Sequence, residues 1–182
     1  MDFLKYEGPT DPTITGSFGN ILTYKNLKLN VFVTYSFGNV IRLDPVFSNA
    51  YSDLDAMPKE FKNRWMKAGD ENVTNIPTIV STRMNQQYAY LNMAYNAYNY
   101  SDVRIADGGF IRLKEISLSY DLPAKVINFF RLNKLQLKLQ ATNLCLLYAD
   151  SKLNGQDPEF FRSGGVSTPV PKQFTFTVRL GL

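Results

Sequence analysis

The chain has 182 residues, of which 45% are hydrophobic and 14% aromatic, a composition that argues against intrinsic disorder. It contains no histidine and one cysteine, which excludes Ser/His/Asp and Cys/His triads, His-rich metal sites and an internal disulfide. The net charge is +4 and the basic residues are scattered, so we expect no nucleic-acid partner. The sequence predicts neither a membrane-spanning helix nor an N-terminal signal peptide.

Alternation of apolar and polar residues predicts five β-strands. We expect them at about 14–24, 27–43, 110–122, 134–147 and 172–182, each long enough to cross a bilayer when tilted, because ~9–11 residues suffice. The last is the clearest, since apolar residues occupy every second position from 174 to 182. Phe32 breaks the alternation of the second strand, and a change of phase in the third predicts a bulge near Lys114.

Short and long connections alternate between these strands. Lys25 and Asn26 predict a hairpin turn, and Pro123 is suited to begin a short helical turn, whereas the predicted loops 44–109 and 148–171 are long. Outer-membrane barrels show this alternation, with short periplasmic turns and long extracellular loops. The residues therefore favour an all-β fold, an antiparallel transmembrane β-barrel segment of about five strands. A soluble antiparallel sheet packed on a core is the alternative.

Aromatic residues lie near both ends of the predicted strands. Tyr24 and Tyr120 are expected at the short-turn ends. At the long-loop ends we expect Tyr35, Phe37, Phe110, Tyr148 and Phe174. Two such girdles are typical of membrane interfaces.

The predicted loop 44–109 contains the candidate binding residues. A helix predicted over 58–67 would place Phe61 and Trp65 on one side. Further on, five tyrosines lie among asparagine and glutamine residues, a combination suited to sugar or peptide recognition, because rings stack on apolar faces while amides donate and accept hydrogen bonds. The candidates among them are Tyr88, Tyr90, Tyr95 and Tyr98. Packing of the loop is the alternative role for all five candidates, Trp65 included.

Lys138 and Arg179 occupy polar positions of two predicted strands. A charge facing hydrocarbon costs ~2–4 kcal/mol at the bilayer midplane, so we predict that both face the barrel lumen. Glu115 is an expected partner for this pair of cations.

The chain offers little for catalysis. Cys145 is flanked by leucines and is expected to be buried rather than reactive. Asp157 and Glu159 are the weak basis of an enzyme alternative, because their spacing on a loop fixes no acid/base geometry. We predict no catalytic residue, no cofactor and no metal site.

Several segments resemble, in order, the C-terminal part of SusC/RagA-family TonB-linked outer-membrane proteins of Bacteroidetes. The most specific is DGGFIRLKEISLSYDLP at 107–123, which is similar to DGsyLRLKnisLgYtLP in that family. The others are GSFGN at 16–20 with YKNL at 24–27, ATNL at 141–144, GQDPE at 155–159 and PVPKQFTF at 169–176. The resemblance extends from about Gly8 to Leu182.

The resemblance implies a lead-in at 1–13 and, over 14–182, the last five strands of a 22-stranded barrel with long extracellular loops, so that Met1 would be an internal start. It further implies an importer of glycans or peptides in the cell outer membrane. The implied partners are outer-membrane lipid, the rest of the barrel and its plug, TonB through an N-terminal part that this chain lacks, a SusD-like lipoprotein, and an oligosaccharide or peptide substrate. A soluble β-rich carbohydrate-binding module is the alternative function.

Overall fold

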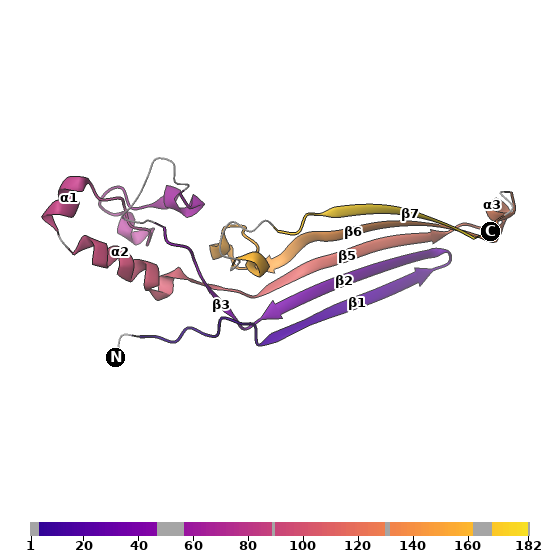
Figure 1. The fold of residues 1–182 in the computed structure, drawn as a ribbon, viewed down its shortest axis with the longest axis horizontal. Helices are drawn as coiled ribbons and strands as arrows, with labels where there is room; N and C mark the ends of the chain where they lie inside the picture. The colour runs from indigo at the N-terminus through magenta and orange to yellow at the C-terminus, as the bar shows by residue number, and fades with distance from the viewer. Residues whose placement is uncertain (1–3, 47–56, 89, 130–131, 162–168, 182) are drawn as a thin grey trace.

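A long antiparallel sheet of five strands runs through the computed structural model, which describes residues 4–46, 57–88, 90–129, 132–161 and 169–181 (Figure 1). Neighbouring strands are hydrogen-bonded in chain order, which confirms the predicted antiparallel sheet. The strands are β1 (Ile14–Tyr24), β2 (Leu27–Phe37), β5 (Phe110–Asp121), β6 (Lys134–Ala149) and β7 (Gln173–Gly181). Residues 47–56 and 162–168 of the predicted loops, and Leu182 of the predicted last strand, lie outside the described residues.

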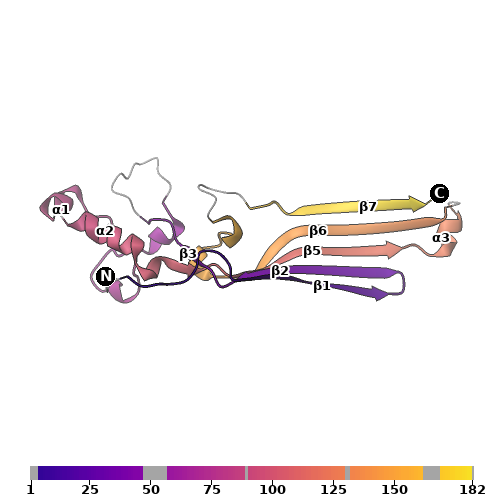
Figure 2. The ribbon, with the colours of Figure 1, turned by 60° about the horizontal axis from the view of Figure 1, so that its bottom comes forward.

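The connections lie at opposite ends of the sheet. The β1–β2 hairpin turn and α3 (Ala124–Phe129) are at one end, and the helical region and the N-terminus are at the other (Figures 1 and 2). That region contains α1 (Thr82–Gln87), α2 (Leu91–Tyr100), and the 3-10 helices η1 (Lys59–Asn63), η2 (Asp70–Asn72), η3 (Asp102–Arg104), η4 (Ser151–Leu153) and η5 (Pro158–Phe160). None of the helices in the described part is long and apolar enough to cross a membrane.

The second strand is shorter than predicted. Residues 40–42 form a separate strand, β3 (Val40–Arg42), which pairs with β4 (Ile105–Asp107) in a small second sheet. The break falls at Gly38, whose φ of +83° is strained for residues with a side chain. A Cβ there would lie 2.0 Å from Oγ1 of Thr13, so the lead-in chain also requires glycine at this position.

The five-stranded sheet leaves many large apolar side chains exposed, whereas in its central strands several polar side chains are buried. One face consists of rows of apolar side chains, and the other is mostly polar. Phe176 on the apolar face is 62% exposed, whereas Gln136 on the polar face is only 8% exposed. A representative apolar row runs across all five strands through Leu22, Leu29, Leu118, Leu139 and Phe176. Large exposed apolar surfaces of this kind mark a contact with lipid or with another protein.

Bulges decide which residues face each side. Lys114 is skipped in the pairing of β5 with both neighbours, which confirms the predicted bulge. Because the bulge reverses the alternation, Arg112 shares the polar face with its neighbour Thr34, while Leu113 shares the apolar face with Val33. Phe32 lies on the polar face, where its ring packs over Gly19, since a Cβ on Gly19 would be 3.0 Å from Cδ2 of Phe32.

Aromatic residues gather at both ends of the apolar face, with two corrections to the predicted set. The rings of Tyr35 and Phe37 are 6.0 Å apart, and the ring of Tyr148 is 6.2 Å from that of Phe37. Phe110 is not among them, because the bulge turns it to the polar face beside Ser36. Phe174 aligns with Ala141 and thus lies well inside the sheet rather than at its loop end.

Tyr24 and Tyr120 share one row at the short-turn end, as predicted, because both pair with Leu27. Cys145 pairs with Leu113 on the apolar face and is exposed, so the prediction that it is buried is wrong. The flanking leucines are not core residues, since a single-layer sheet has no apolar core to bury them.

The apolar core of the described residues lies outside the five-stranded sheet. One cluster contains Ile41, Leu43, Ala106 and Leu153, packed against Phe161. The second contains Val46, Phe61 and Ile76, packed against Met57 and Tyr98. The helical region therefore packs like a small globular domain placed at the end of the strands.

We expect Phe61→Ala to lower the free energy of unfolding of the helical region by about 3–5 kcal/mol, because it leaves a cavity among Val46 and Ile76. The fluorescence of Trp65, the single tryptophan, reports unfolding in urea from the same region. Val73→Ala, at an exposed position, is the matched control and should leave the midpoint unchanged. Equal midpoints for both variants would contradict the assignment of Phe61 to a packed core.

Candidate functional site

Arg104 organises the helical region. Its guanidinium is 2.8 Å from Oε1 of Glu60, donates to the backbone carbonyl of Asp44, and lies 5.7 Å from the centre of the Tyr98 ring. The arginine is almost completely buried, so it holds three segments of the loop together at once. Burial lowers the pKa of Arg104, but the hydrogen bond and charge of Glu60 outweigh it, and the net pKa is raised. Arg104 stays charged.

The candidate residue Trp65 has a structural contact. The predicted helix over 58–67 is wrong, because η1 ends at Asn63 and the backbone is extended at Arg64. Trp65 then bonds through its backbone N–H to the carbonyl of Ile76, and its indole N–H donates to Oε2 of Glu71 over 2.9 Å. The hydrogen bond from Trp65 also lowers the pKa of the Glu71 carboxyl.

The four candidate tyrosines divide into two pairs. Tyr95 is 9% exposed and donates its hydroxyl hydrogen bond to the carbonyl of Thr78, while Tyr98 packs on the second core cluster. Tyr88 and Tyr90 point outward, and Tyr90 is 76% exposed. Tyr95 and Tyr98 therefore stabilise the loop, and Tyr88 and Tyr90 are the pair available to a partner.

The outer surface of α1 and α2 has the composition of a protein interface. Between Thr82 and Ser101 the sequence has one charged residue, Arg83. Large exposed side chains along the same stretch are Met84, Tyr88, Tyr90, Met93 and Tyr100. Tyrosine and methionine are enriched at protein interfaces and most charged residues are depleted there.

The polar face of the sheet contains both candidate cations. Nζ of Lys138 is 4.0 Å from Oε1 of Glu115, the expected partner, and Asn30 donates to the same oxygen over 3.2 Å. Arg179 lies on the same face as Gln136, its neighbour across the β6–β7 pair. Gln136 donates in turn to Oδ1 of Asp121 over 2.8 Å.

An ion pair between Arg112 and Asp157 was not foreseen from the sequence. The nitrogen Nη2 of Arg112 is 2.5 and 2.6 Å from the two carboxylate oxygens of Asp157, and 3.2 Å from Oε2 of Glu159. Asp157 also accepts from the backbone N–H of Glu159 over 3.1 Å and so caps η5. The two acidic residues of the enzyme alternative thus have a structural partner, since both contact one arginine.

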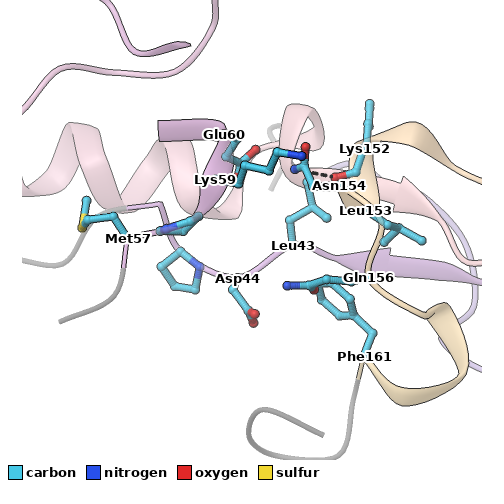
Figure 3. A pocket seen from close by; sticks show the side chains of 12 residues that line it. Leu43, Asp44, Met57, Lys59, Glu60, Lys152, Leu153, Asn154, Gln156 and Phe161 are labelled. Atoms are coloured by element: carbon cyan, nitrogen blue, oxygen red, sulfur yellow. Dashed lines mark hydrogen bonds between the residues drawn. The ribbon is translucent and has the colours of Figure 1, made fainter. Parts of the chain in front are cut away.

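A cavity of about 340 Å³ opens between the two loops (Figure 3). Its lining is mixed, with Leu43, Met57 and Phe161 beside Lys59, Glu60 and Lys152. Within the described ranges, no group of three or more acidic or sulfur side chains is placed to hold a metal ion.

The chain is similar to two curated proteins of Formosa agariphila (strain DSM 15362). It is 27% identical to TonB-dependent receptor P3 over 155 residues, covering 85% of the chain and 14% of that receptor. It is 26% identical to TonB-dependent receptor P26 over 192 residues, covering 94% and 17%. No family model matches the chain.

Solved structures of one transport system share its fold. The RagAB peptide importer in its open-open state matches with a TM-score of 0.66 and 21% identity, covering 98% of this chain and 18% of that one. The RagAB peptide transporter matches with a TM-score of 0.65 and 22% identity, covering 96% and 18%. The chain therefore spans less than a fifth of the length of each of these relatives.

In sequence the chain is similar to TonB-dependent receptors, and in fold it is similar to the RagAB importer. Both likenesses support the resemblance to the SusC/RagA family that the sequence motifs predict. The relatives are named as receptors and transporters and not as enzymes, so the enzyme alternative is not supported.

We expect the helical region to lose stability above about pH 10, the ordinary pKa of tyrosine. Burial raises the pKa of Tyr98, although the charge of Arg104 opposes this, so ionisation favours the unfolded chain as pH rises. Urea unfolding followed by Trp65 fluorescence at increasing pH measures the effect. Tyr98→Phe should weaken the pH dependence, whereas Tyr100→Phe, at an exposed position of α2, should keep it. A Tyr98→Phe profile identical to the wild type would contradict the prediction.

Proposed function

We propose that this chain forms the C-terminal strands of a 22-stranded outer-membrane barrel that imports peptides or oligosaccharides. The observation that carries the proposal is the five-stranded sheet with an exposed apolar face and a polar face on which Ser117 and Gln136 are buried. In a membrane such a sheet places its apolar rows against lipid and its polar side chains toward the lumen. Lys138 and Arg179 would then face the solute path.

The edges of the sheet support a larger barrel. Among the described strands, β1 and β7 each have one neighbour, which leaves a row of backbone N–H and C=O groups unpaired on either side. Unpaired groups of this kind cost several kcal/mol each in hydrocarbon, so spanning sheets close into barrels. We infer that further strands of the same receptor pair with both edges, and that a plug domain and TonB act elsewhere in that receptor.

The exposed surface of α1 and α2 supports a role in contacts outside the membrane. We infer that Tyr88 and Tyr90 contact a SusD-like lipoprotein, because the surface is poor in charge and rich in tyrosine and methionine. The similar RagAB structures are named as a peptide importer, which favours a peptide among the two substrate classes.

The soluble carbohydrate-binding module is less well supported. Such a module needs a second layer over the apolar face, and in the described ranges Leu22, Leu139 and Phe176 remain exposed. Its candidate sugar-binding tyrosines also include two that are needed for packing, Tyr95 and Tyr98.

We expect Leu139→Arg to destabilise the membrane-inserted receptor by ~2–4 kcal/mol, because it places a charge against hydrocarbon. Gln140→Arg, one residue further on the opposite face, is the matched control and should cost much less. Urea unfolding of receptor refolded in lipid vesicles measures both. Equal effects of the two substitutions would contradict a lipid-facing assignment, since an exposed leucine of a soluble sheet tolerates arginine.

Replacing Tyr88 and Tyr90 together by alanine should weaken binding of the SusD-like lipoprotein by about tenfold or more, as expected for exposed aromatic residues at an interface. Co-purification of the lipoprotein with the receptor, followed by titration, measures the loss. Tyr6→Ala removes an exposed tyrosine outside the α1–α2 surface and should leave binding unchanged. Unchanged binding in the double variant would remove this surface from the interface.

A further inference from the structure

We propose that the segment Asp150–Phe161 is a strap, latched by Arg112, that restricts access to the polar face of the sheet at its loop end. The inference rests on the proposed function, because the polar face bounds a solute path only in a barrel. The ion pair between Arg112 and Asp157 lies within the chain and is independent of which substrate or lipoprotein the receptor binds.

The first step is the direction of Arg112. Without the bulge at Lys114, the alternation of β5 would place residue 112 with Ile116 and Leu118 on the apolar face. The bulge turns it to the polar side, beside Thr34 of β2. The guanidinium of Arg112 is thereby kept off the apolar face of the sheet and can bind a segment that lies over the polar face.

The second step is the latch. The side chains of Arg112 and Asp157 are each only 6% exposed, and Glu159 adds a second carboxylate at 3.2 Å. Removing one partner from a buried pair leaves an uncompensated charge, so Arg112 stays buried only while the strap is closed over it. The pair therefore couples the position of residues 157–159 to strand β5, 45 residues earlier in the chain.

The first half of the strap is fixed independently. Oδ2 of Asp150 accepts from the backbone N–H of Asp107 over 2.8 Å, and Nζ of Lys152 donates to the carbonyl of Ile105 over 2.9 Å. Leu153 is 1% exposed in the first core cluster. With β4 holding the start of the strap and Phe161 packed against the first core cluster at its end, the ion pair with Arg112 is the contact that holds residues 157–159 over the sheet.

A groove beneath the strap shows what it covers. A hollow of about 460 Å³ lies between Pro158 and Glu159 of the strap and the loop end of the sheet. Its floor includes Thr34, Ser36 and Phe110, all on the polar face. The strap thus stands over the polar face with open space beneath it, and its position sets how large a solute can enter there.

The test measures entry into this groove in the complete receptor, with Cys145→Ser to remove the native thiol. A cysteine at Thr34, which lines the groove, is labelled with maleimides carrying polyethylene glycol chains of increasing size. Labelling is compared between the wild-type latch, Asp157→Asn, and the double variant Arg112→Met/Asp157→Leu, which removes both buried charges and leaves the half-exposed carboxylate of Glu159 in contact with solvent. Peptide mass spectrometry quantifies the label, and a cysteine at Thr177, on the same face but next to Lys138, is the control site.

We expect both latch variants to raise labelling at position 34 by the larger reagents about tenfold, because the equilibrium constant for local opening of the strap rises by that factor. Labelling at 177 should stay constant. Unchanged labelling at 34 in a receptor that still shows heat-modifiable migration in SDS gels overturns the strap and leaves the proposed function intact. A wild-type receptor that lacks heat-modifiable migration overturns the proposed barrel, and with it the strap.

Discussion

Backbone hydrogen bonds between neighbouring strands hold the sheet together, because the sheet has no apolar core of its own. Every buried apolar side chain among the described residues lies in the helical region or its small second sheet. The strands must therefore satisfy their donors and acceptors side by side, over eleven or more residues in β1, β2, β5 and β6. In hydrocarbon this requirement becomes strict, since no water replaces a missing neighbour.

The helical region is stabilised differently, through two buried arginines that reach across the sequence. Arg104 connects Glu60, Asp44 and Tyr98 within the longer loop. Arg112 connects the sheet to the shorter loop through Asp157. Both guanidiniums are paired with carboxylates, as buried charges must be. The loops thus gain fixed positions relative to the strands without a large core.

The parts of the fold that follow a local pattern could be predicted from the sequence. Alternation indicated the strands, the turn at Lys25 and Asn26, and the bulge at Lys114, because each depends on neighbours in the chain. The side of the sheet occupied by Phe110 was missed, although the same bulge determines it. A bulge reverses the face of every residue beyond it, and the assignment of Phe110 from the position of aromatic residues alone did not include this reversal.

The candidate site was harder to predict, since its contacts join distant residues. Nothing near Arg112 marks a partner 45 positions away, and Arg104 stands in a short segment with no periodicity. The tyrosines were found as a group, but only burial separates Tyr95 and Tyr98 from Tyr88 and Tyr90. Trp65 was assigned to a helix because its spacing from Phe61 fits one, whereas its backbone bond to Ile76 extends the chain instead.

The bulge at Lys114 divides β5 into two segments whose apolar and polar residues alternate in opposite phase. From residue 115 onward, the even-numbered residues lie on the apolar face, whereas from 110 to 113 the odd-numbered residues lie there. The polar-face residues of the segment 110–113, which includes Arg112, can therefore change while the strand pairing of the rest of β5 stays the same. Substitutions at positions 110 and 112 therefore change the polar face at the loop end and leave the pairing of residues 115–121 as it is.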